Sequence, residues 1–80
     1  MAEFDLKIIS PEKELYDGKC ESLVFDTPDG SYGIMAGHTP LTASVSEGEI
    51  KITFGGSRQS VIVKKGILHF ENNSALIITG

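Results

Sequence analysis

Apolar and polar residues alternate along much of this chain, in short runs separated by turn-forming residues. Phe4, Leu6 and Ile8 alternate with polar neighbours, and the same period of two recurs in residues 41–45 and 50–54. Successive side chains of a β-strand point to opposite faces, so each run would place its apolar residues on one side. The pattern therefore predicts strands with one buried face.

Turn-forming residues interrupt these runs about once every ten residues, a spacing typical of β-sandwiches and barrels. The glycine pair at 55–56 predicts a tight hairpin between residues 50–54 and residues 60–64, because glycine adopts positive φ without strain. The asparagine pair at 72–73 predicts a second hairpin, because asparagine tolerates left-handed backbone better than most residues. We therefore expect an all-β fold.

Two stretches break the alternation. Ile8 and Ile9 are consecutive, and residues 23–25 are all apolar, so apolar side chains fall on both faces of these strands. A strand in the middle of a sandwich, or a strand with a β-bulge, would account for the pattern. The alternative is that one of the apolar faces binds a partner protein.

Length and charge exclude several classes of function. The chain has 80 residues, of which 40% are apolar, which predicts one domain over residues 1–80. Seven basic and eleven acidic residues give a net charge of −4, which disfavours binding to nucleic acid or anionic lipid. The longest apolar run, residues 75–78, falls far short of the ~20 residues that cross a bilayer. We expect any membrane association to pass through another protein.

The single cysteine, Cys20, cannot form an internal disulfide, and the N-terminal residues lack the apolar stretch of a signal peptide. Both observations favour a reducing, cytosolic-type compartment. Cys20 lies in a strand-like run and is predicted to be a small core residue.

Candidates for catalysis or metal binding are few. His38 and His69 are the only histidines, and neither has a cysteine or second histidine at metal-ligand spacing. His69 is predicted to face solvent from a strand. His38 could act as a general base, but no spacing ties a nucleophile and a carboxylate to it. We predict instead that His38 hydrogen-bonds to loop backbone or to a partner, and that the chain uses no cofactor and no metal.

The most unusual segment is residues 26–41, in which glycines and prolines surround Tyr32, Ile34 and Met35. This composition predicts a bent, non-repetitive loop with apolar side chains on its surface. Tyrosine and methionine are enriched where proteins meet, so the segment is predicted to bind a protein rather than to form a catalytic pocket.

Four segments, taken in order, resemble one family: Ser10–Glu12, Leu15–Gly18, Asp29–Leu41 and Gly48–Ile52. The family pattern in the third segment is Gly-x-x-Gly-Ile-Leu-Pro-Gly-His-Ala-Pro-Leu. This chain matches that pattern at Gly30, Gly33, Ile34, Gly37, His38, Pro40 and Leu41. Over essentially its whole length, the chain resembles the N-terminal domain of the epsilon subunit of the rotary F-type ATP synthase.

The resemblance implies a flattened antiparallel β-sandwich of about ten strands. It also implies a non-catalytic rotor subunit of the central stalk, which joins the gamma subunit to the membrane ring of c subunits during ATP synthesis driven by ion transport. Such a complex is peripheral, on the cytoplasmic face of the bacterial cell membrane. Carried over to the matching positions, the c-ring-facing loop comprises Asp29, Gly30, Ser31, Tyr32 and Gly33, and the gamma-facing residues are Met35, His38, Leu41 and Ala43.

Full-length members of the family continue into a C-terminal helical hairpin that inhibits ATP hydrolysis. Because this chain ends at Gly80, we expect neither the hairpin nor the inhibition. Two other classes of function are weighed against the resemblance. One is a small ligand-binding β-sandwich module. Such a module would bind sugars poorly, because the chain has no tryptophan and only two tyrosines. The other is an enzyme with His38 as its base.

Overall fold

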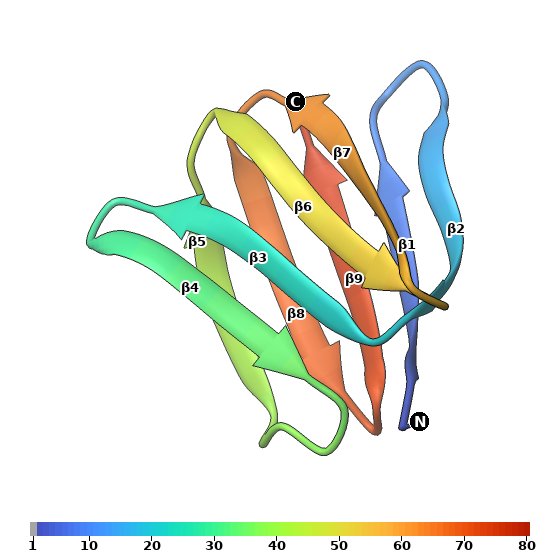
Figure 1. Cartoon of the computed structure of the whole chain (residues 1–80). Coiled ribbons are helices and arrows are strands. Elements are labelled where there is room, and N and C mark those ends of the chain that lie inside the picture. Colours follow the sequence, from blue (N-terminus) through green and yellow to red (C-terminus); the bar gives the residue numbers. More distant parts are fainter. Residues whose placement is uncertain (1) are drawn as a thin grey trace.

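The computed structural model describes residues 2–80, which form nine β-strands and no helix (Figure 1). The strands are β1 (Phe4–Ile9), β2 (Glu14–Cys20), β3 (Ser22–Thr27), β4 (Gly30–Met35), β5 (Leu41–Val45), β6 (Gly48–Phe54), β7 (Ser57–Val63), β8 (Gly66–Glu71) and β9 (Ser74–Thr79). One sheet has the order β2-β1-β9-β8-β5 and the other has the order β4-β3-β6-β7. The two sheets stack face to face, so the predicted β-sandwich is confirmed.

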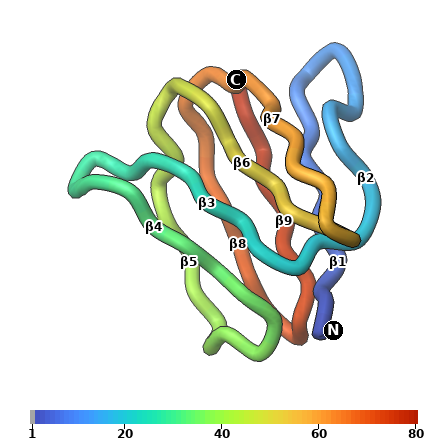
Figure 2. Tube along the Cα trace, viewed as in Figure 1, coloured from blue at the N-terminus to red at the C-terminus, as the bar shows by residue number. Residues whose placement is uncertain are grey.

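Two details of the expected architecture differ. The described residues form nine strands where about ten were expected. Within residues 2–80, β1 pairs with β9 in parallel, while the other strand pairs are antiparallel. Figure 2 shows β9 lying between β1 and β8, so the first and last strands are neighbours. Alternation along the sequence determines which side chains face the core, but it carries no information about the direction of a distant strand.

Both predicted hairpin turns are confirmed, although residues 50–54 pair with residues 57–61 rather than with the expected residues 60–64. Gly55 and Gly56 have φ of 61° and 79° and connect β6 to β7, whose first pair is Phe54 with Ser57. Asn72 and Asn73 have φ of 52° and 57° and connect β8 to β9. Positive φ at both central residues is the backbone of a type I′ turn, whose twist matches that of the flanking strands.

The two stretches that break the alternation lie in interior strands. The register of β1 against β2 shifts between Ile8 and Ile9, as a β-bulge requires. In β3, Leu23 and Phe25 are buried while Val24 is half-buried on the outer face. The expectation of a bulged or central strand is therefore confirmed, and binding of a partner to an apolar outer face stays a prediction.

The core lies between the sheets and is built from the inward residue of each alternating pair. Phe4, Leu6 and Ile8 are at most 1% exposed, in agreement with their predicted face. Cys20 is also fully buried, and its Sγ–H donates to the carbonyl oxygen of Ser22 at 3.1 Å. The prediction that Cys20 is a core residue is confirmed.

Gly66 lies close to the backbone of the neighbouring strand β9. It pairs with Thr79 at the end of the β8–β9 ladder. A Cβ atom at residue 66 would overlap the carbonyl oxygen of Ile78 and lie 2.9 Å from the Cα of Thr79. Because both neighbours are backbone atoms, no side-chain rotation relieves the overlap.

Substitution of Gly66 by alanine should therefore destabilise the fold. We expect Gly66→Ala to lower the free energy of unfolding by about 1–3 kcal/mol, the usual cost of overpacking. Gly33→Ala is the matched control in β4, since its nearest neighbour would be 3.8 Å away and its φ is not in the left-handed region. Urea denaturation should leave this control within about 0.5 kcal/mol of the parent chain. Equal losses in the two variants would contradict the close-approach explanation.

Candidate functional site

Residues 26–41 cross from one sheet to the other at an open side of the sandwich. β4 is the edge strand of the four-stranded sheet, β5 is the edge strand of the five-stranded sheet, and residues 36–40 connect them (Figure 1). The prediction of a non-repetitive loop is wrong for residues 30–35, which form β4. Pairing with β3 along all six residues of β4 imposes a strand on this glycine-rich stretch.

The nine residues singled out from the sequence fall on four successive segments of the chain. Asp29 lies in the β3–β4 turn; Gly30, Ser31, Tyr32, Gly33 and Met35 lie in β4; His38 lies in the connecting loop; Leu41 and Ala43 lie in β5. The c-ring-facing set and the gamma-facing set therefore share one strand.

The β3–β4 turn is held by short side-chain contacts. The hydroxyl of Thr27 accepts the N–H of Asp29 at 3.1 Å and donates to the carbonyl of Gly30 at 2.8 Å. The hydroxyl of Ser31 donates to a carboxylate oxygen of Asp26 at 3.0 Å. Gly30 has a φ of 122°, a conformation that side chains disfavour. The turn is thus a defined shape with Asp29 exposed at its tip.

The gamma-facing residues divide into two kinds. Met35 is 66% exposed on the outer face of its sheet. Leu41 and Ala43 are half-buried and pack against the core from the inner side of β5. The outward residues of the same strand are Thr42 and Ser44. Only the remaining exposed part of Leu41 and Ala43 can touch a partner.

Five aromatic rings close the open side between β4 and β5. They form a continuous edge-to-face series, Phe25–Tyr32–His38–Phe70–Phe4, with centroid distances of 5.8, 5.9, 5.9 and 5.4 Å. We call this series the ring chain. Its first two rings belong to one sheet, its last two to the other, and the loop residue His38 joins them. Edge-to-face contacts place the positive edge of one ring against the negative face of the next.

The hydrogen bonds of His38 determine its tautomer. Its Nδ1 lies 2.7 Å from the carbonyl oxygen of Thr39, which can only accept, so Nδ1 carries a proton. In the neutral ring, Nε2 then accepts the hydroxyl proton of Tyr32 at 3.0 Å. The prediction that His38 bonds to loop backbone is confirmed. Both nitrogens are occupied, and neither contact is the nucleophile that a catalytic base would need.

His69 faces solvent from β8, as predicted. Its Nε2 donates to a carboxylate oxygen of Glu71 at 2.8 Å, and its Nδ1 lies 2.9 Å from the hydroxyl of Thr42 on β5. The imidazole and the carboxylate side chains are each more than half exposed. Sequence reasoning missed this network, although Glu71 lies two residues from His69 and so on the same strand face.

An apolar row on the outer face of the five-stranded sheet was also missed. Ile9 pairs with Ile78, and Ile78 pairs with Ile67, so the three side chains adjoin across β1, β9 and β8. Ile67 and Ile78 are 56% and 53% exposed, and Leu76 lies beside them at 36%. The sequence signals were the consecutive apolar pair that contains Ile9 and the apolar run 75–78, which contains Leu76 and Ile78.

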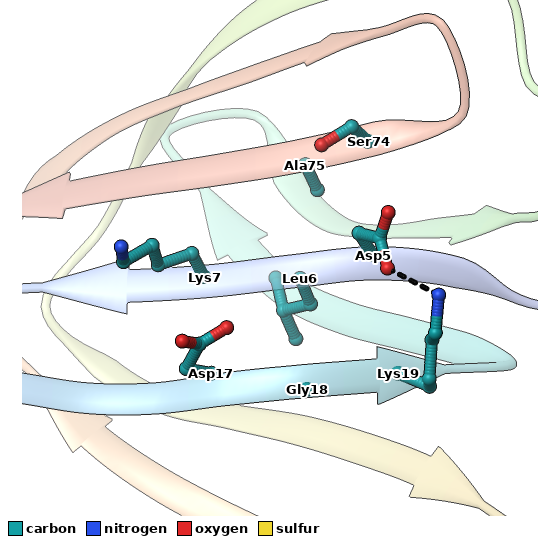
Figure 3. Close-up of a pocket in the computed structure, with 8 residues that line it drawn as sticks. All are labelled: Asp5, Leu6, Lys7, Asp17, Gly18, Lys19, Ser74 and Ala75. Atoms are coloured by element: carbon teal, nitrogen blue, oxygen red, sulfur yellow. Dashed lines mark hydrogen bonds and ion pairs between the residues drawn. The ribbon is translucent and has the colours of Figure 1, made fainter.

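The same face carries a shallow depression over β1 and β2 (Figure 3). Asp5 and Lys19 are joined across the strands at 2.6 Å, and this hydrogen bond and the charge of Asp5 raise the pKa of Lys19. Lys7 and Asp17 contribute one further charge of each sign. The four charges cancel, so the depression has no net charge to attract an ionic ligand.

Within residues 2–80, no group of three or more His, Cys, Asp or Glu side chains is placed to hold a metal ion. The same residues contain no helix that is long and apolar enough to span a membrane.

The sequence model of the family described as "ATP synthase, Delta/Epsilon chain, beta-sandwich domain" matches residues 3–80. The chain belongs to this family. An ATP synthase epsilon chain of Caldicellulosiruptor saccharolyticus is 35% identical over 79 residues, which cover 99% of this chain and 58% of the relative. That of Ruminococcus albus is 36% identical over 78 residues, with 98% and 58% covered. This member of the delta/epsilon family thus spans little more than half the length of these curated relatives.

Solved structures share the fold. A chain of the Euglena gracilis mitochondrial ATP synthase, from a structure of its OSCP, F1 and c-ring parts, superposes with a TM-score of 0.90 at 18% identity. The match covers 99% of this chain and 51% of that one. A chain of the Tetrahymena thermophila central stalk and c-ring gives 0.77 at 16% identity, covering 94% and 61%. The β-sandwich fold is therefore preserved where the sequence is not.

The ring chain predicts unequal roles for the two histidines. His38→Ala removes two edge-to-face contacts and should lower the free energy of unfolding by about 1–3 kcal/mol. His69→Ala removes only exposed contacts and should cost within about 0.5 kcal/mol. Urea denaturation of both variants tests the difference, and a larger loss in His69→Ala would contradict the role given to the ring chain.

Burial also predicts how stability depends on pH. Burial raises the pKa of the Cys20 thiol above its usual range, while hydrogen bonds with the backbone of Ser22 and Thr53 act in the opposite direction. At a pH between the thiol pKa of the unfolded chain and that of the folded chain, Cys20 therefore keeps its proton only in the folded chain. The contribution of this raised pKa to folding stability is fully present below the unfolded-state pKa of about 8.5, and it is lost as pH rises through the folded-state pKa.

We expect the free energy of unfolding of the parent chain to fall more steeply above about pH 8.5 than that of Cys20→Ala. The smaller alanine side chain should lower stability by an amount that does not vary with pH. Urea denaturation across this range gives both profiles, and parallel profiles would overturn the prediction.

Proposed function

We propose that residues 1–80 act as the N-terminal β-sandwich domain of an F-type ATP synthase epsilon subunit. In this role the domain is a non-catalytic part of the central stalk and couples the gamma subunit to the c-ring during ATP synthesis driven by ion transport. Its place is a peripheral membrane complex on the cytoplasmic face of a bacterial membrane, which it reaches through its partners. The family match over residues 3–80 is the observation that carries the proposal.

The proposed contacts run along β4, from the turn at its start to the loop at its end, and continue into β5. The turn with Asp29, together with Gly30, Ser31, Tyr32 and Gly33 of β4, faces the c-ring. Met35 at the far end of β4, His38 in the loop, and Leu41 and Ala43 of β5 face gamma. A six-residue strand separates the two ends by roughly 17–20 Å.

This geometry suits the transmission of force. β4 is paired with β3 over its full length, and Ile34 anchors it to Leu23 and Phe25 of the core. A push on the turn therefore moves a packed strand rather than a flexible loop, because close-packed interiors have low compressibility. The ring chain extends the same connection across to β8 and β1.

A non-catalytic role agrees with the chemistry of the described residues. Both ring nitrogens of His38 are hydrogen-bonded, one to Tyr32 and the other to Thr39. The exposed Thr42–His69–Glu71 network has its three groups in contact but lies on an open sheet face. Neither arrangement favours an enzymatic function over the proposed coupling function.

Met35 offers the sharpest test of the gamma contact. Placing a carboxylate in an apolar interface leaves a buried, unpaired charge, so Met35→Asp should weaken gamma binding by at least about tenfold. Ile62→Asp is the matched control. Ile62 is 72% exposed on β7, at the opposite edge of the same sheet, and carries the same change of charge.

Affinity is measured by titrating each purified variant with the gamma subunit of the same organism. We expect Ile62→Asp to bind within about twofold of the parent chain, because Ile62 lies far across the sheet from Met35. Equal weakening by the two substitutions, or by neither, would remove the support for the proposed gamma surface.

A further inference from the structure

The backbone of the loop that carries His38 forms few hydrogen bonds within the loop. Residues 36–40 connect edge strands of two different sheets and contain no strand or helix. One backbone hydrogen bond closes the turn, from the N–H of His38 to the carbonyl of Met35 at 3.2 Å. Gly37 has a φ of 84° and is exposed. Its N–H points away from the loop and is satisfied from elsewhere in the chain.

That partner is Asn73, in the β8–β9 turn 36 residues away. The side-chain oxygen of Asn73 accepts the N–H of Gly37 at 3.0 Å. Its side-chain nitrogen donates to the carbonyl of Glu3 at 2.8 Å, just before β1. The backbone carbonyl of Asn73 also accepts the N–H of Asp5 at 3.3 Å. One residue thus joins the β8–β9 turn, the start of β1 and the connecting loop.

The turn itself does not require this amide. Asn72 and Asn73 both adopt positive φ, a conformation that glycine supplies equally well. Among residues 2–80, no hydrogen-bond partner is found for the side chain of Asn72. Only a side chain that both accepts and donates can make the two contacts of Asn73, which excludes glycine and an ionised aspartate.

We propose that Asn73 is a positioning residue for the gamma-facing loop, which fixes Gly37 and thereby the placement of His38 and Met35. This proposal takes the gamma subunit as the partner and therefore rests on the proposed function. The distribution of contacts supports it, because Asn73 bonds the backbone of Gly37 while the ring chain contacts the neighbouring side chain of His38. With both attachments present, the loop is presented to gamma in one shape and less ordering is needed on binding.

The test compares Asn73→Gly with Asn72→Gly. Both variants keep a residue suited to the turn, but only the first loses the amide. Hydrogen exchange of the Gly37 N–H should become at least about fivefold faster in Asn73→Gly, the effect of losing one net hydrogen bond. It should change by less than about twofold in Asn72→Gly. Gamma affinity should fall about threefold or more in the first variant alone.

The two readouts separate the ways in which the proposal can fail. Unchanged Gly37 exchange in Asn73→Gly overturns it, whatever the affinity. Faster exchange with unchanged affinity also overturns it, provided that Met35→Asp weakens gamma binding. If Met35→Asp leaves binding unchanged as well, the assignment of gamma is what fails, and the exchange result alone decides whether Asn73 orders the loop.

Discussion

The closure of one side of the sandwich by the ring chain is the interaction on which the rest of this structure depends. Two sheets that meet only through apolar faces are open wherever edge strands fail to join, and here β4 and β5 belong to different sheets. Phe25 and Tyr32 on one side and Phe70 and Phe4 on the other are linked through the imidazole of His38. The same side chain therefore fills the gap and lies on the proposed binding surface, so stability and recognition are not separable at His38.

This closure explains how so small a domain can be stiff. A chain of 80 residues buries only about 60% of the surface that its unfolded form exposes, and Cys20 is free. Its rigidity comes from the positions of its stabilising contacts. The strand that bears both proposed contact regions is paired along its whole length, and the loop at its end is held by the rings at His38 and by Asn73 at Gly37. This arrangement suits the proposed rotor role, in which force would enter at fixed points of a packed body.

The outer faces are not equivalent. The five-stranded sheet exposes Ile67 and Ile78 in one row, beside compensated pairs such as Asp5 with Lys19. Exposed ion pairs contribute little to stability, so these charges serve mainly to keep the face soluble. The four-stranded sheet exposes Met35 and Ile62 singly at its two edges. These exposed apolar side chains thus lie on the edge strands β4 and β7 of the four-stranded sheet and on the inner strands β8 and β9 of the five-stranded sheet.

Local patterns in the sequence determined the strands that alternate, both two-residue turns and the burial of residues such as Ile8 and Cys20, because side-chain alternation and positive φ are properties of neighbouring residues. The family pattern around His38 also identified the segment that carries the site. Only the tertiary structure decided that β1 and β9 run parallel and that Gly30–Met35 is a strand. It alone joined Asn73 to Gly37 and His38 to Phe70, because contacts between residues more than 30 positions apart arise when sheets pack, and no local pattern encodes them.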